Sequence, residues 1–169
     1  AQGDVLIFLH ADTVLPDDAF GHIRFALRDG EHEAGAFRLA FDVETPLLRF
    51  YGFCTRLPLP QICFGDRALF MRRSTFDALG GFPDIPIFED LEMVQMLHRR
   101  GRFAFLPADV TTSARRFLKV GPLRQQLRNT YLWLHFMLGT KPERVADHYR
   151  YDEDENNSPV IEDNLHENV

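Results

Sequence analysis

The feature that most constrains the fold is a run of five apolar residues, Val5–Leu9, which ends at the polar cluster His10-Ala11-Asp12-Thr13. A continuous apolar run of this length predicts a buried strand, of the kind found in parallel sheets. In open α/β sheets, ligands bind beside the carboxyl ends of the strands. His10 and Asp12 are therefore the first candidate site residues.

Helical and strand patterns alternate along the rest of the chain. Helices are indicated by apolar stripes, by Pro or Thr at their starts and by Gly at their ends. Strands are indicated by short apolar or alternating runs. We expect helices at about 16–29, 45–54, 74–79, 89–100, 122–138 and 142–149, and strands at 5–9, 37–41, 68–71, 102–106 and 110–113. This order predicts an α/β layered fold.

The length of 169 residues favours one domain, with or without a tail. The net charge of −6 is uneven, because the segment from Asp152 to Val169 contains seven acidic residues and no Lys or Arg. We expect a folded domain over residues 1–150 and an acidic, disordered tail over 151–169. An acidic tail argues against a nucleic-acid partner, because binding to phosphate backbones needs a clustered basic surface.

Asp12 is the candidate metal ligand. A carboxylate held at the end of a buried strand suits Mg²⁺ or Mn²⁺, which prefer oxygen ligands and share sites with substrate phosphates. The alternative is an ordinary turn carboxylate ahead of Pro16. Spacing alone does not separate these two interpretations.

Glu89 and Asp90 follow a loop rich in Gly and Pro and open a helix. Acidic residues are common at helix N-termini, where they complement the dipole and accept hydrogen bonds from free N–H groups. A carboxylate on such a loop is also suited to act as a general base for a hydroxyl nucleophile. Both interpretations stay open at this point.

Two further pairs of residues are candidates for substrate binding. Arg115 and Arg116 follow a predicted strand, and paired guanidinium groups suit a diphosphate, although a solvated surface pair is the alternative. Gly65, followed by Asp66, comes just before another strand, where a glycine allows close approach of the backbone to a ligand.

Three segments in this order resemble family 2 glycosyltransferases of the GT-A fold, and in particular a bacterial subgroup of uncertain substrate. They are Gly3-Asp4-Val5-Leu6-Ile7-Phe8-Leu9-His10-Ala11-Asp12-Thr13, Gly80-Gly81-Phe82-Pro83 leading to Glu89-Asp90, and Ser113-Ala114-Arg115-Arg116-Phe117. The resemblance implies an incomplete GT-A (Rossmann-like) domain over residues 1–150, with a mixed sheet flanked by helices.

The resemblance also implies roles for single residues. The metal ligand of the family's Asp-x-Asp motif matches Asp12, and the cofactor implied is Mn²⁺ or Mg²⁺. His10 replaces the motif's first Asp, and it is expected to contact the ribose or phosphate of the substrate or to face the metal through a water molecule. Asp90 matches the catalytic base, beside Glu89. Arg115 and Arg116 match a motif that holds the diphosphate.

The chain departs from the family's pattern at its start. Relatives begin with a strand and an Asp-Gly-x-Ser-x-Asp segment that holds the nucleotide base, whereas this chain opens at Ala1-Gln2-Gly3-Asp4. Three explanations follow. The chain is a fragment, a partner such as a second copy covers the exposed sheet edge, or the protein has lost its activity.

The leading functional hypothesis is an enzyme that transfers a sugar, with inversion, from a nucleotide-diphospho sugar to an unknown hydroxyl acceptor. The first alternative is a truncated, non-catalytic relative that acts as a binding or interaction module. The second is a phosphatase similar to the haloacid dehalogenases, because the run from Leu6 to Val14 resembles their first motif, with His10 in place of the nucleophile.

Cys54 and Cys63 form no disulfide framework or CxxC motif, which favours a reducing, cytoplasmic setting.

The helix expected at 122–138 carries Trp133, Phe136 and Met137 beside Arg124, Arg128 and His135. It has two interpretations: ordinary core packing, or peripheral contact with a membrane surface.

Overall fold

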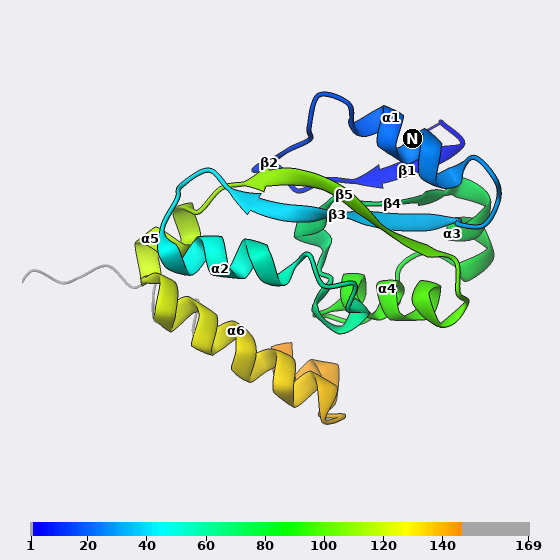
Figure 1. Ribbon diagram of the computed structural model, residues 1–169. Helices are drawn as coiled ribbons and strands as arrows, with labels where there is room; N and C mark the ends of the chain where they lie inside the picture. The colour runs from blue at the N-terminus through cyan, green and yellow to red at the C-terminus, as the bar shows by residue number, and fades with distance from the viewer. Residues whose placement is uncertain (1, 147–169) are drawn as a thin grey trace, which may run out of the picture.

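The computed structural model describes residues 2–146 and contains one mixed sheet of five strands (Figure 1). The strands are β1 (Val5–Phe8), β2 (Thr13–Val14), β3 (Ala34–Phe41), β4 (Leu69–Arg72) and β5 (Phe103–Thr112), in the order β1-β4-β3-β5-β2. Strands β3 and β5 are parallel, and the other pairs are antiparallel. The α/β class and the mixed sheet are therefore confirmed.

The expectation of a parallel first strand is wrong. Strand β1 pairs with β4 in the antiparallel direction, with Phe8 opposite Leu69. Its apolar residues face both sides of the sheet, since Ile7 packs against one core and Phe8 against the other. The continuous apolar run therefore reports two covered faces and carries no information on strand direction. Among residues 2–146, no strand pairs with the other edge of β1.

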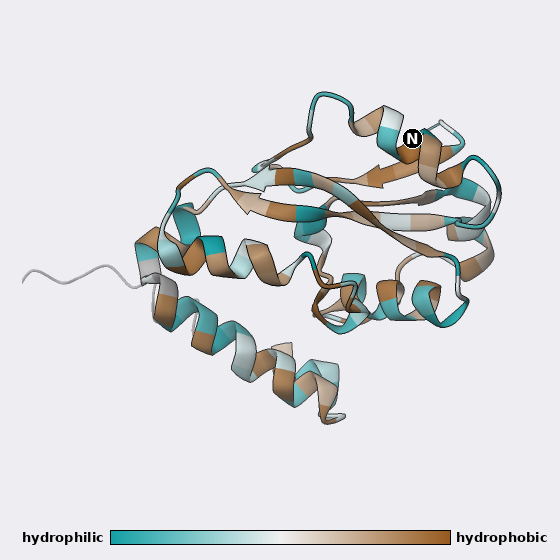
Figure 2. Ribbon diagram, in the orientation of Figure 1, coloured by the Kyte–Doolittle hydropathy of each residue, from teal (hydrophilic) through white to brown (hydrophobic). Residues whose placement is uncertain are grey.

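Helices cover both faces of the sheet (Figure 1). Helix α1 (Ala19–Leu27) packs on one face, where Ile23 and Leu27 meet Phe37 and Phe70. The other face holds α2 (Pro46–Cys54), α3 (Arg73–Leu79) and α4 (Glu89–Arg99). In Figure 2 brown and teal residues alternate along these helices, and the apolar residues that are buried, such as Leu48 of α2 and Leu97 of α4, stabilise the fold.

Most expected helices lie within one to three residues of their observed bounds. The Thr45 hydroxyl caps α2 by accepting a hydrogen bond from the N–H of Leu48 (3.2 Å), with Pro46 at the first helical position. Helix α6 spans Pro122–Met137, and residues 142–146 are helical as expected. No helix among residues 2–146 has the length and apolar character needed to cross a bilayer. The expected tail, 151–169, lies outside the described residues.

The main differences lie around β5. The two strands expected at 102–106 and 110–113 are one strand, interrupted by a bulge between the pairs Ala36–Phe105 and Arg38–Asp109. Pro107 lies in this irregularity, where its missing N–H breaks no regular pair. Strand β2 and helix α5 (Arg115–Val120) were not expected. A two-residue strand and a six-residue helix are too short to show a clear periodicity.

Candidate functional site

Four polar side chains from three segments gather at one end of the β1–β4 pair. His10 and Asp12 follow β1, and Asp66 lies in a short 3-10 turn (Gly65–Arg67) just before β4. Asp90 is in the first turn of α4. Because β1 and β4 are antiparallel, the end of β1 and the start of β4 lie together. We call His10, Asp12, Asp66 and Asp90 the acidic cluster.

Gly65 is in close contact with two members of the acidic cluster. Its backbone N–H donates a hydrogen bond to Oδ2 of Asp90. A Cβ atom added at Gly65 would lie 2.9 Å from Oδ2 of Asp90 and 3.3 Å from Nε2 of His10. The two side chains therefore converge on the same glycine, which has no room for a side chain of its own.

The pKa of Asp66 reflects its burial and its position near the other members of the acidic cluster. Burial raises the pKa of the half-buried Asp66 carboxyl to about 6, and the neighbouring carboxylate of Asp90 adds to the rise. His10 opposes the shift, while Asp12 contributes to it. The other three members thus lie within electrostatic range of the Asp66 carboxyl group. A carboxyl group with a pKa this near neutrality is suited to proton transfer, or to binding a cation that stabilises its charged form.

Two non-glycine residues with a left-handed backbone flank the cluster. Ala68, just after the Gly65–Arg67 turn, has φ 49°, and Phe88, just before Glu89, has φ 62°. Such conformations cost about 1–3 kcal/mol and persist only where the surroundings impose them. At Phe88 the ring is packed against Phe64 and Phe136, with centroids 6.0 and 5.0 Å away.

Arg67 fixes the turn that carries Gly65 and Asp66. Its side chain is buried, and its Nε and Nη2 atoms donate hydrogen bonds to the carbonyls of Phe37 (2.7 Å) and Thr55 (2.9 Å). Its guanidinium also lies 5.4 Å from the ring centroid of Phe105. Arg67 therefore ties the turn to the core.

Asp12 connects the acidic cluster to the pair of arginines. Its carbonyl accepts a hydrogen bond from the N–H of Ser113 (3.1 Å), two residues before Arg115. Arg115 and Arg116 open α5, and both side chains are exposed. The carboxylate of Asp42 fixes this turn by accepting a hydrogen bond from the N–H of Ala114 (2.7 Å). The arginines thus lie next to the Asp12 segment in the fold.

Asp90 and Glu89 occupy different environments at the start of α4. The Asp90 carboxylate is half-buried and accepts two backbone hydrogen bonds, from Gly65 and from Leu91 (2.7 Å). The side chain of Glu89 is exposed. Glu89 is therefore an exposed acid in the first turn of the helix, whereas Asp90 both accepts a hydrogen bond from a helix N–H and lies in the acidic cluster.

The acidic cluster offers oxygen donors, but the described residues form no complete set of metal ligands. Among residues 2–146, no group of three or more His, Cys, Asp or Glu is arranged to hold a metal ion. Mg²⁺ is usually held by one or two carboxylates together with water and substrate phosphates, so such a group is not required. The exposed Asp12 and the half-buried Asp66 are the oxygen ligands that the acidic cluster offers.

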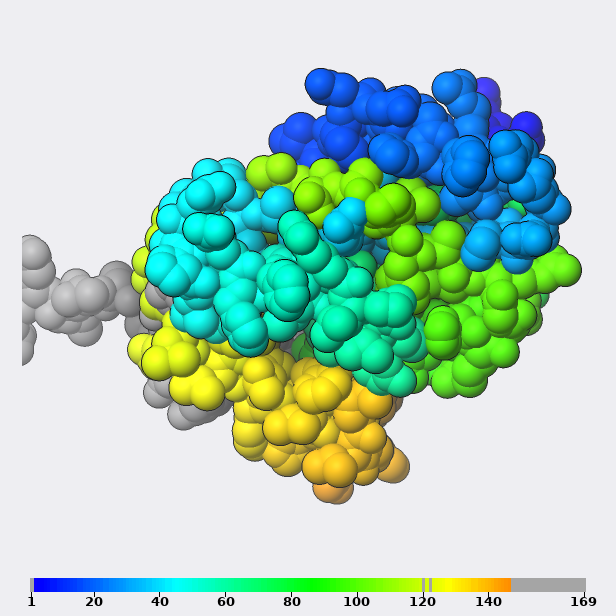
Figure 3. Space-filling view, in the orientation of Figure 1, coloured from blue at the N-terminus to red at the C-terminus, as the bar shows by residue number. Residues whose placement is uncertain are grey.

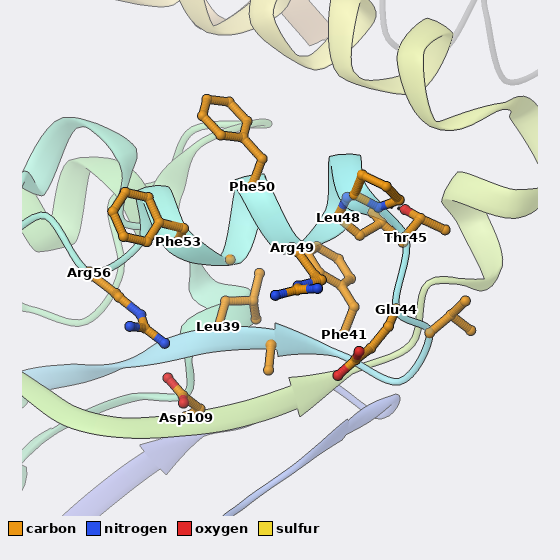
Figure 4. Close-up of a pocket in the computed structure, with 14 residues that line it drawn as sticks. Leu39, Phe41, Glu44, Thr45, Leu48, Arg49, Phe50, Phe53, Arg56 and Asp109 are labelled. Atoms are coloured by element: carbon orange, nitrogen blue, oxygen red, sulfur yellow. Dashed lines mark hydrogen bonds between the residues drawn. The ribbon is translucent and has the colours of Figure 1, made fainter.

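Two cavities lie on the α2 face of the sheet. One, of about 450 Å³, has a largely apolar wall that includes Tyr51, Phe117 and Trp133, and it reaches Asp66 and Arg67. The other, of about 720 Å³, lies between α2 and β3, with Arg49, Arg56 and Asp109 around it (Figure 4). The first cavity adjoins the acidic cluster through Asp66, and its size suits a small molecule.

Sequence reasoning singled out Gly65 but gave no role to Asp66 or Arg67. The available signal was the run Gly65-Asp66-Arg67 directly before a strand, at the edge where His10 also lies.

A scan against protein-family models found no match, and searches of curated proteins and of solved structures found none either.

Proposed function

We propose that this chain is the metal-binding and acceptor-side part of a family 2, GT-A-type glycosyltransferase. It would transfer a sugar from a nucleotide-diphospho sugar to an acceptor hydroxyl. The observation that carries the proposal is the acidic cluster, in which Asp12 and Asp90 share one environment although 78 positions separate them in the chain. The neighbouring Arg115 and Arg116 add the positive charge that a diphosphate requires.

Asp90 is the proposed base. Two backbone N–H groups fix the orientation of its carboxylate. A carboxylate has about four lone-pair positions, so others remain for the acceptor hydroxyl. In the proposed reaction the acceptor oxygen bonds to the anomeric carbon, the bond to the diphosphate breaks, and the hydroxyl proton passes to Asp90.

Asp12 is the proposed metal ligand, and Arg115 and Arg116 face the donor's phosphates. Mn²⁺ or Mg²⁺, when bound, would supply positive charge beside the diphosphate leaving group. His10 lies beside Gly65 and Asp90, where its ring is available to the ribose, the phosphates or a metal-bound water. Glu89, which is exposed beside Asp90, is also proposed to contact the substrate.

The test is calorimetric binding of a panel of nucleoside diphosphates with and without Mn²⁺. It uses the 169-residue chain and, in parallel, any longer form that the reading frame encodes. We expect Asp12→Asn to weaken metal-dependent binding by at least about tenfold. We expect Asp90→Asn to retain binding but to lower transfer by about 10²–10⁴-fold. The proposal fails if neither form binds any nucleoside diphosphate.

A non-catalytic binding module is the second candidate, and the apolar cavity of about 450 Å³ beside Asp66 favours it. A small apolar ligand that binds without Mn²⁺, and equally well in Asp12→Asn, would support this candidate over the enzyme.

The phosphatase alternative is tested by a separate assay. Hydrolysis of an aryl phosphate by the parent chain, lost in Asp12→Ala, would support it.

A further inference from the structure

Helix α6 has two separate apolar faces. The inner face holds the helix to the body: Leu132 is buried, and the ring of Phe136 packs on Phe88 with 5.0 Å between centroids. Nε1 of Trp133 donates a hydrogen bond to the carbonyl of Gln61 (2.7 Å). The core-packing interpretation of this helix is therefore correct for its inner face.

The outer face is also apolar, but nothing in the described part of the chain covers it. Its side chains are between 45% and 83% exposed. They are Leu123, Leu127, Tyr131, Leu134 and Leu138, which we call the outer stripe. At 3.6 residues per turn they fall within an arc of roughly 80°, and they span about 22 Å along the helix. Isolated exposed leucines need no explanation, but a stripe in register along one helix marks an interaction surface.

The charged residues of α5 and α6 all have the same sign. From Arg115 to Leu138 the chain contains no Asp or Glu. The same segment contains Arg115, Arg116, Lys119, Arg124 and Arg128. In Figure 1, α5 lies at the start of α6, so the basic residues gather at one end of the stripe and along its flank. Figure 3 shows α6, in yellow to orange, forming an outer edge of the molecule.

We propose that the outer stripe of α6 docks on the surface of an anionic lipid bilayer. A helix with an apolar face and basic flanks lies in the plane of the interface, with its leucines among the lipid chains and its cations at the headgroups. The net charge of −6 opposes this only weakly, because salt screens charges beyond about 8 Å. This inference does not depend on the proposed reaction.

Charge also decides against a second copy of the chain on the same stripe. A two-fold dimer with parallel α6 helices would bring two sets of Arg115, Lys119 and Arg124 toward each other, and one with antiparallel helices would still give neither set an acid on α5 or α6 to pair with. Like charges set opposite each other in an interface are unfavourable. An anionic lipid bilayer instead offers negatively charged headgroups for the basic residues and an apolar chain region for the leucines.

The experiment is co-sedimentation of the full chain with vesicles of phosphatidylcholine alone or mixed with phosphatidylglycerol. We expect binding to the mixed vesicles that weakens as salt is added. The variant Leu127→Ser/Leu134→Ser should reduce the bound fraction at least about tenfold, and Lys119→Glu/Arg124→Glu should reduce it similarly. These side chains are exposed, so the thermal midpoint should stay near that of the parent chain.

A matched control is Phe20→Ser, which removes an apolar side chain that is 62% exposed on α1, across the sheet. It should leave vesicle binding unchanged. Equal loss in Phe20→Ser would show non-specific adsorption and overturn the proposal. So would absence of binding to mixed vesicles, or a concentration-dependent dimer in the ultracentrifuge that Leu127→Ser/Leu134→Ser converts to monomer.

Discussion

The backbone N–H of Gly65 donates a hydrogen bond to Oδ2 of Asp90, which joins the turn before β4 to the first turn of α4. The proposed base is thus oriented by a segment 25 residues earlier in the chain. Because Nε2 of His10 approaches the same glycine, any change at Gly65 acts on both side chains at once. This relationship makes Gly65 the most informative single position in the candidate site.

We expect Gly65→Ala to lower sugar transfer by about 10²-fold, since a displacement of about 1 Å at a reacting group has an effect of this size. The new Cβ would lie 2.9 Å from Oδ2 of Asp90, so the carboxylate must shift. The matched control is Gly3→Ala, where the nearest atom is 3.5 Å away. Transfer assays and thermal melts of both variants test this. Unchanged transfer in Gly65→Ala would remove Asp90 from its proposed role.

Asp66 should make the stability of the protein fall as pH rises from about 4 to about 6. The pKa of Asp66 is about 6 in the folded protein, above the unfolded value of about 4. Within this window the folded state holds a proton that the unfolded state releases, so raising the pH favours unfolding. The loss is complete above pH 6 and has an upper limit of about 3 kcal/mol.

Urea unfolding of Asp66→Asn and the parent chain across this window measures the effect. The free energy of unfolding of Asp66→Asn, relative to the parent, should increase with pH between about 4 and 6 and then level off. Added Mn²⁺ should reduce this difference at neutral pH if the cation binds beside Asp66. A difference that is flat with pH would contradict the burial of the Asp66 carboxyl beside Asp90.

The class of fold was predictable from sequence because its signals are local. Thr45-Pro46 at the start of α2 and Gly80, with φ 79°, after α3 act within one turn of chain. The direction of β1 was not predictable in the same way. Leu6 and Ile7 would be apolar in a parallel or an antiparallel strand, since burial depends on what covers each face.

The site was predictable only in part, for a related reason. Asp12 and Asp90 stand beside recognisable motifs, but Asp66 is drawn into the cluster by tertiary packing. The buried guanidinium of Arg67, bonded to carbonyls 30 and 12 residues away, fixes that turn. A single sequence gives no sign that an arginine will be buried, because most arginines lie at the surface.

The two cysteines should differ sharply in reactivity. Cys63 is fully buried, and burial raises the pKa of its thiol to about 12, whereas Cys54 is half-buried. Since the thiolate is the reactive form, a thiol reagent at pH 8 should modify Cys54 first and Cys63 only when the protein unfolds. Mass spectrometry of the parent and of Cys54→Ser measures this. Rapid labelling of native Cys54→Ser would show that the part of the core around Cys63 is open to solvent.

Arg67→Lys tests whether the buried guanidinium holds the turn of the candidate site. A lysine has one ammonium group, so it cannot reproduce the planar fork that reaches the carbonyls of both Phe37 and Thr55. A buried carbonyl left without a donor costs about 1–3 kcal/mol, and we expect a loss of stability of that order. The turn carrying Gly65 and Asp66 should also loosen, which would lower transfer along with stability.

The same replacement at the exposed Arg28 is the matched control. Its guanidinium bonds the neighbouring Asp29 in solvent (3.0 Å), and an exposed ion pair of this kind contributes little. Arg28→Lys should therefore leave the thermal midpoint and transfer unchanged. If Arg67→Lys lowers the thermal midpoint but leaves transfer intact in the surviving folded protein, the turn tolerates the change, and the orientation of Asp90 must come from α4 alone.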